Sequence, residues 1–139
     1  MTLTTPLPTA WAHLPNAGHI DRVLANLQEH PEKWKAARYA AWRQTAWVAA
    51  WHAAYTAAYT AAQSTAKIVA WHASQNAAWG AARDSVWGAG RSAIAALIAW
   101  DDCAHMLDLA EATLSELRAA GNHPAILLST AASVLKETK

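Results

Sequence analysis

The sequence predicts an all-α protein, a compact bundle of four to six helices that pack against one another through alanine. Alanine accounts for 37 of the 139 residues and is the strongest helix former, which excludes a β-sandwich or barrel. Large or polar residues also recur at every fourth position through the middle of the chain, whereas strands require a period of two. Nine Trp and only 15% charged residues argue against disorder, and the length fits one domain.

A four-residue repeat, large–x–small–small, runs in register from Tyr39 to Arg91. Each step advances the row by about 40° around a helix axis, so no single flat face can hold it. One unbroken helix to Ala120 would be about 130 Å long, and we therefore favour several shorter helices. The weakest points for breaks are residues 63–65, 74–76 and 88–90. The row consists of Tyr39, Arg43, Trp47, Trp51, Tyr55, Tyr59, Gln63, Lys67, Trp71, Gln75, Trp79, Arg83, Trp87 and Arg91.

The elements follow in order as one domain over residues 1–139. Residues 1–18 form an N-terminal arm, and residues 19–30 form an amphipathic first helix. The repeat helices occupy 31–93 and begin with Pro31 at a first helical position. An acidic helix spans 94–120 and is closed by Gly121, and a last helix spans 124–137.

The repeat contains a longer echo at a spacing of 20 residues. The Trp51–His52 pair and the Trp71–His72 pair occupy equivalent positions in two similar segments, which begin at residues 48 and 68. The tetrad alone does not require a paired Trp-His, so the echo predicts two equivalent helices.

The charges are sorted along the chain although the net charge is only +1. Residues 33–100 contain seven basic residues and one acidic residue, whereas residues 101–118 contain five acidic residues and one basic residue. The acidic segment either balances the basic charges within the molecule or forms part of a second surface. The small net charge argues against binding of extended nucleic acid.

Cysteine content and hydropathy predict a cytoplasmic protein. The single Cys103 excludes an intramolecular disulfide framework and a Cys-based zinc cluster, and the start shows no secretory pattern. The stretch 44–66 carries no charge, but it is rich in Ala and Thr, contains no Leu and spreads its aromatic residues evenly. We therefore expect a core helix and no membrane association.

Basic and aromatic residues alternate along the repeat, as in Trp79-Arg83-Trp87-Arg91. Arginine stacks on Trp in purely structural ladders, but the same groups stack on bases and bind phosphate. We therefore predict a Trp- and Arg-lined pocket for a small anionic, nucleotide-like ligand. Its candidate residues are Arg43, Trp51, His52, Trp71, His72, Trp79, Arg83, Trp87 and Arg91.

A second polar cluster consists of Asp101, Asp102 and His105. On a helix, Asp101 and His105 share a face at i, i+4, where they could supply two metal ligands or orient a general base. Two ligands do not complete a site, so we favour a structural cluster and predict no catalytic residue, metal or cofactor.

The tetrads lead into the block Leu-Ile-Ala-Trp-Asp-Asp-Cys at 97–103, and Gly-Asn-His-Pro-Ala-Ile-Leu-Leu follows at 121–128. Over residues 31–128 the chain resembles a group of phage and bacterial proteins that carry Ala-Ala-Trp/Arg-Asp repeats ahead of a Leu-Ile-Ala-aromatic-Asp-Asp-Cys block. The tetrads are also loosely similar to a family of immunity proteins. The resemblance implies a phage or mobile-element context and therefore the host cytoplasm. It transfers no catalytic residue, and the present tetrads contain few Asp.

Three functional classes follow from these patterns. The leading hypothesis is a non-enzymatic, self-associating protein that sequesters a nucleotide-like molecule, an immune signal if the context is phage. The alternative is an inhibitor or immunity protein that binds another protein through an aromatic helical surface. A hydrolase or metal enzyme built on Asp101, Asp102 and His105 is the minority interpretation.

Overall fold

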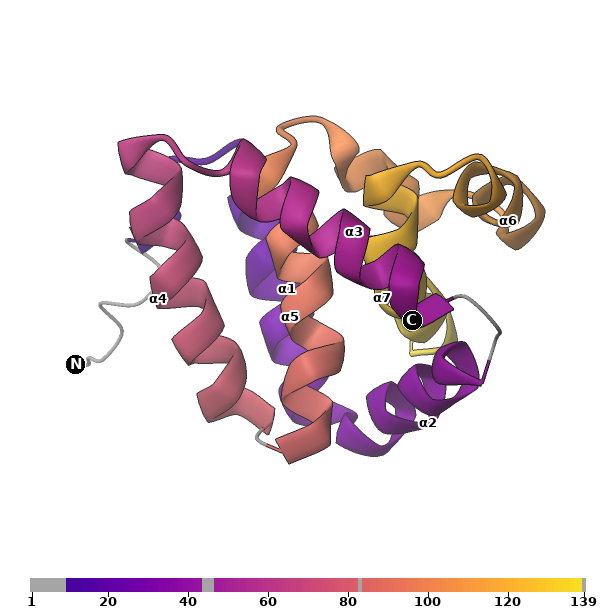
Figure 1. Cartoon of the computed structure of the whole chain (residues 1–139). Coiled ribbons are helices and arrows are strands. Elements are labelled where there is room, and N and C mark those ends of the chain that lie inside the picture. Colours follow the sequence, from indigo (N-terminus) through magenta and orange to yellow (C-terminus); the bar gives the residue numbers. More distant parts are fainter. Residues whose placement is uncertain (1–9, 44–46, 83, 139) are drawn as a thin grey trace.

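The computed structural model describes residues 10–43, 47–82 and 84–138, without the side chains of residues 82–89. These residues form seven α-helices and a 3-10 helix and contain no strand, so the predicted all-α bundle is confirmed, although the described residues form more helices than the four to six expected (Figure 1). The elements in order are α1 (Ala17–Glu29), α2 (Pro31–Trp42), α3 (Trp47–Ala61), α4 (Thr65–Ala82), α5 (Asp84–Ala99), η2 (Cys103–Asp108), α6 (Glu111–Ala119) and α7 (His123–Glu137).

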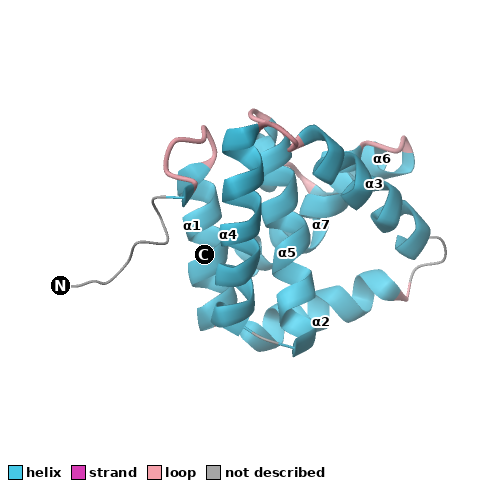
Figure 2. Ribbon diagram, turned by 60° about the vertical axis from the view of Figure 1, so that its left-hand side comes forward, coloured by secondary structure: helices cyan, strands magenta, loops and turns pink. Residues whose placement is uncertain are grey.

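Helix α5 lies at the centre of the bundle and packs against α1, α2, α3, α4 and α7 (Figures 1 and 2). Its residues 92–99 are all buried, and five of these eight positions are Ala or Ser. Small side chains let neighbouring helices approach on every side, because no large group holds the backbones apart. The Ala-rich sequence thus explains how one helix accommodates five helical neighbours.

The predicted breaks agree with the structure at one of three points. Helix α3 ends at Ala61 and α4 begins at Thr65, as expected. The other two points were wrong, because residues 74–76 lie inside α4 and residues 88–90 lie inside α5. Ser74 fits a helix interior because its hydroxyl donates to the carbonyl of Trp71, 3.0 Å away and three residues back. Gly90 fits because Leu27 of α1 occupies the space that a side chain would need.

The predicted acidic helix over 94–120 was also wrong, since the structure divides this segment among α5, η2 and α6. Helix α5 ends at Ala99, where side chains from elsewhere satisfy its last carbonyls: the amide of Asn16 donates to Leu97 at 2.9 Å, and the ammonium of Lys67 donates to Ala99 at 3.2 Å. These contacts depend on tertiary packing, so the local sequence did not reveal them.

At the two ends of the chain the structure agrees in part with the predicted elements. Helix α2 begins with Pro31, and Gly121 follows α6 at φ +83°, where its N–H donates to Arg118 in a Schellman-type cap. The prediction of an N-terminal arm over residues 1–18 was wrong for residues 10–18, which are the part of this segment that the structure describes. There, Trp11 is 1% exposed and its indole N–H donates to Asp21 at 2.9 Å, so this residue belongs to the core.

Candidate functional site

An aromatic ladder runs along the side of α3 that faces the bundle. The rings of Trp47, Trp51 and Tyr55 are stacked, with centroids 6.3 and 5.1 Å apart and planes inclined by 24° and 17°. Residues four apart on a helix are neighbours on its surface, so the tetrad spacing itself brings these rings together. The ladder therefore follows directly from the repeat.

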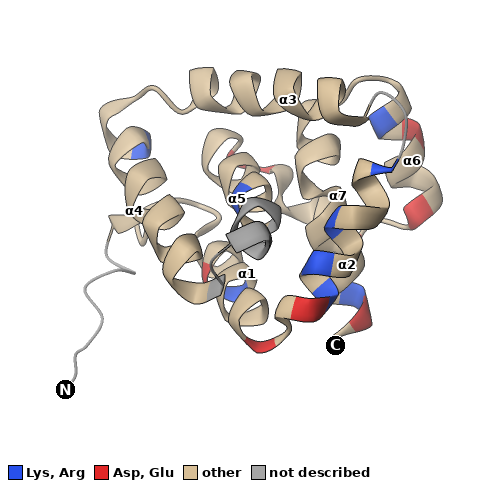
Figure 3. Cartoon of the chain, turned by 60° about the horizontal axis from the view of Figure 1, so that its bottom comes forward, with Lys and Arg blue, Asp and Glu red and all other residues tan. Residues whose placement is uncertain are grey.

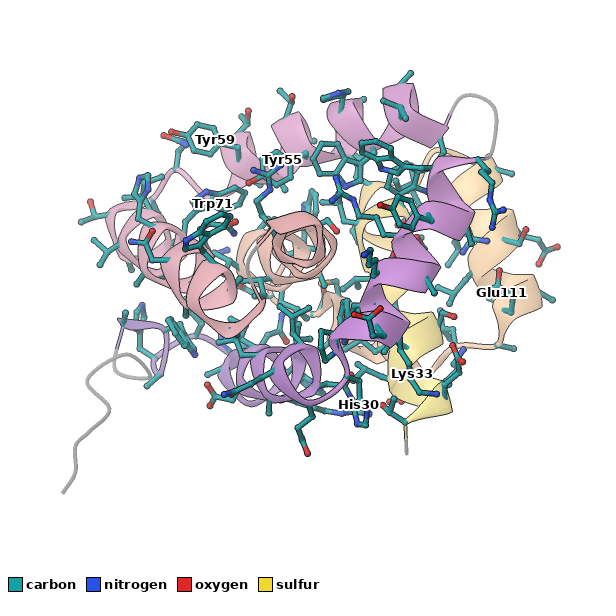
Figure 4. All side chains as sticks on the ribbon, turned by 90° about the horizontal axis from the view of Figure 1, so that it is seen from below. His30, Lys33, Tyr55, Tyr59, Trp71 and Glu111 are labelled. Carbon is teal, nitrogen blue, oxygen red and sulfur yellow. The ribbon has the colours of Figure 1, made fainter. Side chains whose placement is uncertain are left out.

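Trp71 of α4 completes the ladder from the neighbouring helix. Its ring meets Tyr55 and Tyr59 edge to face, with centroid distances of 5.5 and 5.4 Å. Figure 4 shows these three side chains together at the corner between α3 and α4. Trp71 is 4% exposed, whereas Tyr59 at the end of the ladder is 43% exposed. Edge-to-face contacts add to the free energy of burial, so the ladder also joins α3 to α4.

Arg91 of the central helix α5 lies against the middle of the ladder. Its guanidinium carbon is 4.9 Å from the ring centroid of Tyr55 and 5.6 Å from that of Trp51. Both distances are within the range of cation–π attraction. A positive charge of α5 is thus held against two aromatic rings of α3.

A second guanidinium approaches from α2. Arg38 lies over the ring of Trp42, one turn further along the helix, at 4.6 Å. Burial lowers the pKa of Arg38 from its ordinary value, and the positive charge of Arg91 lowers it further. Two like charges therefore act on each other in a place that is partly withdrawn from water. We call the group Arg38, Trp42, Trp51, Tyr55 and Arg91 the arginine–aromatic site.

Burial also affects the phenol of this site. It raises the pKa of Tyr55, and Arg91 opposes that shift by favouring the phenolate. A tyrosine hydroxyl is already protonated at neutral pH at its ordinary pKa of 10.0, and the upward shift preserves this state, so Tyr55 presents a neutral ring and a hydrogen-bond donor beside the guanidinium. The site therefore offers positive charge and flat apolar surface without negative charge from this phenol.

The structure brings together three of the predicted ligand residues, namely Trp51, Trp71 and Arg91, on the aromatic ladder. His52 is exposed at the ladder's edge, with its ring perpendicular to Trp51 at a centroid distance of 5.2 Å. The remaining predicted residues divide between exposed positions and positions not described: Arg43, His72 and Trp79 are exposed, Arg83 lies outside the described residues, and so does the side chain of Trp87.

Two residues of the arginine–aromatic site were not predicted, Arg38 and Trp42. Both lie outside the tetrad row. An Arg four residues before a Trp on a helix is a recognisable signal for a cation–π pair, and this signal was present. Tyr55 was part of the row but was not selected as a ligand residue. Its role became visible only when α5 placed Arg91 against it.

The side chains of the acidic cluster after α5 make contacts within the fold. Asp101 forms an ion pair with Lys67 at 2.9 Å, and the Nδ1 atom of His105 lies 2.7 Å from the backbone oxygen of Asp102. The i, i+4 carboxylate–imidazole pair expected on a helix is wrong, because Asp101 lies in the turn between α5 and η2. Lys67 also donates to Ala99, so the pair closes the C-terminus of α5.

Cys103, in the same segment, is buried and hydrogen-bonded. Its thiol lies 3.3 Å from the carbonyl oxygen of Ala96, and burial raises its pKa to about 12, with a further contribution from the negative charge of Asp102. A thiol with this pKa stays protonated at neutral pH and is a poor nucleophile. The described residues contain no group of three or more His, Cys, Asp or Glu side chains that could hold a metal ion.

Two further observations bear on function. Within the described part of the chain, no helix is both long and apolar enough to cross a membrane. No protein-family model, curated protein or solved structure matches the chain.

Proposed function

We propose that this chain is a non-enzymatic binding protein that sequesters a small anionic, aromatic molecule of the nucleotide class at the arginine–aromatic site. The observation that carries the proposal is the position of Arg91, held over Tyr55 and Trp51 while its charge acts on Arg38. Guanidinium groups bind phosphate in a bidentate manner, and an anion between two of them would relieve their repulsion.

The aromatic part of such a ligand has a matching surface on α2. Trp42 is 50% exposed while Arg38 covers part of its ring, so indole surface remains accessible beside the guanidinium. A base stacked on this ring would bring its phosphate close to Arg38. Stacking on an aromatic side chain typically contributes about 1–3 kcal/mol per base, and it does not depend on which base is bound.

The biological setting of this proposal comes from the sequence resemblance. In a phage or mobile-element protein, the sequestered molecule would be a nucleotide that serves the host as an immune signal. Capture without chemistry requires only binding residues, and the arginine–aromatic site consists of residues of that kind.

Isothermal titration calorimetry with adenosine monophosphate and with adenosine tests the proposal. We expect the nucleotide to bind and the nucleoside to bind more weakly, because only the nucleotide carries the anion that the arginines attract. Arg91→Gln should weaken nucleotide binding about tenfold or more, since charge-assisted hydrogen bonds contribute about 1.5–3 kcal/mol. Native mass spectrometry of gently purified protein would show whether a small molecule is retained.

Arg22→Gln is the matched control, because Arg22 is a partly exposed arginine on α1, which contributes no residue to the arginine–aromatic site. The control should bind the nucleotide as the wild type does, and circular dichroism should show that both variants are folded. The proposal fails if no nucleotide in a broad panel, cyclic dinucleotides included, binds to the wild type. It also fails if Arg22→Gln weakens binding as much as Arg91→Gln.

A protein-binding inhibitor is the second candidate, because large apolar side chains are exposed on α2. Tyr39 and Trp42 are 52% and 50% exposed, and exposed aromatic residues are common anchors of protein interfaces. A protein partner of this surface would be lost in Tyr39→Ala and retained in Arg91→Gln. A pull-down with these two variants distinguishes the two candidates.

A further inference from the structure

The 20-residue echo of the sequence reappears in the exposure of α3 and α4. Ala58 and Ala78, at equivalent positions, are both buried, and so are Ala54 and Ser74. Equivalent positions are also exposed in both helices, on the outward side at His52 and His72 and at Thr56 and Asn76, and on the flank at Tyr59 and Trp79. The echo therefore produces two helices with the same inward face and the same outward face.

On α4 the outward face forms a regular stripe. Val69 is 57% exposed and Trp79 is 48% exposed, with exposed His72 and Asn76 between them. The spacings of three, four and three residues are those of a helix seam that faces another helix. We call Val69, His72, Asn76 and Trp79 the α4 stripe.

Helix α4 lies at the edge of the bundle, where its inner side packs against α5 and α1 (Figures 1 and 2). At about 100° per residue, the α4 stripe lies on the opposite side of the helix from buried Ala70, Ser74 and Ala78. Among the described residues, Val69 and Trp79 are therefore about half exposed on the side of α4 that faces away from α5 and α1. This surface is also separate from the arginine–aromatic site.

The α4 stripe carries no charge. Residues 68–82 contain no Asp, Glu, Lys or Arg, and α4 is almost entirely tan in Figure 3, whereas α2 and α6 carry clusters of blue and red. In a two-fold symmetric contact a surface meets its own copy, so a charged face would place like charges together. An uncharged face avoids that repulsion, and this favours a second copy of the chain as the occupant.

We propose that two copies of this chain pair through the α4 stripe, with the two α4 helices antiparallel. The two-fold axis passes through the interface at the level of residue 74 along the helix. In this register Trp79 packs on Val69 of the partner subunit, and His72 lies beside Asn76 of the partner subunit. A large ring thus meets a small side chain, and an imidazole meets an amide with which it forms a hydrogen bond. A parallel pair would instead place Trp79 against its own copy.

The dimer is expected to be weak. The stripe spans eleven residues, or about 15 Å, and contacts between two helices of this length fall at the low end of the area buried by specific interfaces. The association should therefore depend on concentration, with a dissociation constant in the range of about 1–100 µM. It does not require the proposed ligand, so it is tested with the apo protein.

Sedimentation velocity measures this equilibrium, and α3 supplies the matched controls. Val69→Glu and Asn76→Lys should each weaken dimerisation at least about tenfold, because each buries an unpaired charge in the interface. Ala49→Glu and Thr56→Lys introduce the same residues at the equivalent exposed positions of α3 and should leave the dimer unchanged. The proposal is overturned if the wild type remains monomeric up to about 200 µM. Equal weakening by the α3 variants would also overturn it.

Disulfide trapping tests the antiparallel register. A mixture of His72→Cys chains with Asn76→Cys chains should give the mixed disulfide under mild oxidation, since these positions face each other across the proposed interface. Cys103 is buried and should not interfere. Predominant homodisulfides at residue 76 would contradict this register, even if the wild type were a dimer.

Discussion

The side-chain amide of Asn16 donates hydrogen bonds to the carbonyl oxygens of Leu97, at 2.9 Å, and Trp100, at 3.0 Å. Asn16 is 4% exposed and lies 81 residues from Leu97 along the chain. The C-terminus of the central helix is thus capped by a residue that precedes the first helix. This contact fixes one end of α5 relative to α1.

Asn16→Ala should therefore lower the free energy of unfolding by about 2 kcal/mol, because one buried and one partly buried carbonyl lose their donor. Urea denaturation followed by circular dichroism measures the change. Gln28→Ala, at an exposed position of α1, is the control and should change stability by less than about 0.5 kcal/mol. Equal effects of the two substitutions would show that the Asn16 contacts contribute little.

The ion pair between Lys67 and Asp101 predicts unequal effects of removing its two members. Lys67→Ala loses both the ion pair and the hydrogen bond to Ala99, so we expect a loss of about 1–2 kcal/mol. Asp101→Asn should cost less than about 1 kcal/mol, because the side chain of Asp101 is 58% exposed.

Asp101→Asn, together with His105→Ala, also tests the minority hypothesis of a metal enzyme. We expect the metal content of the purified protein to be the same in wild type, Asp101→Asn and His105→Ala, as measured by inductively coupled plasma mass spectrometry. Stoichiometric metal in the wild type that disappears in both folded variants would contradict the structural role of this cluster.

The buried thiol of Cys103 predicts low reactivity and a particular pH dependence. Between the ordinary pKa of 9.0 and the folded value of about 12, the folded protein keeps a proton that the unfolded chain has lost. This contribution to stability is complete below pH 9 and decreases by up to about 1.4 kcal/mol per pH unit above it. Denaturation of wild type and Cys103→Ala at pH 8 and pH 10 should show the wild type losing more.

Ellman's reagent provides an independent measurement on the same residue. At pH 8 the native protein should react slowly and the urea-denatured protein should react at once, because only the unfolded chain exposes the thiol. Fast reaction of the native protein would contradict the burial of Cys103.

Two glycines within helices predict opposite effects of the same substitution. A Cβ atom on Gly90 would lie 2.5 Å from a methyl group of buried Leu27, whereas one on Gly80 would meet no heavy atom within 4 Å. Gly80→Ala should stabilise the protein by up to about 1 kcal/mol through helix propensity. Gly90→Ala should destabilise it by about 1 kcal/mol, because the displaced Leu27 outweighs that gain.

Thermal unfolding of the two variants measures this difference. A rise in the melting temperature of Gly90→Ala equal to that of Gly80→Ala would show that α1 and α5 do not approach as closely as the structure indicates.

Local rules were sufficient for the elements that local interactions define. Pro31 begins α2, Gly121 ends the turn after α6, and the side chain of Asn122 accepts a hydrogen bond from Ala125 at the start of α7. Each of these features depends on residues within about one helical turn, so it could be predicted from the sequence.

Other features depended on partners far away in the chain. The end of α5 at Ala99 required Asn16 and Lys67, and neither residue is adjacent to it in sequence. The arginine–aromatic site was only half predicted for the same reason. The repeat identified Trp51 and Arg91, whereas the contribution of Arg38 appeared only when α2 packed against α5.

The helical class, the aromatic ladder and the equivalence of α3 and α4 follow from local sequence, because each reflects a repeat of four or 20 residues along the chain. The central position of α5, its end at Ala99 and the contact of Arg91 with Tyr55 and Trp51 depend instead on tertiary packing. Alanine faces allow many helix packings of similar energy, so the choice among them depended on long-range contacts such as that between Asn16 and Leu97.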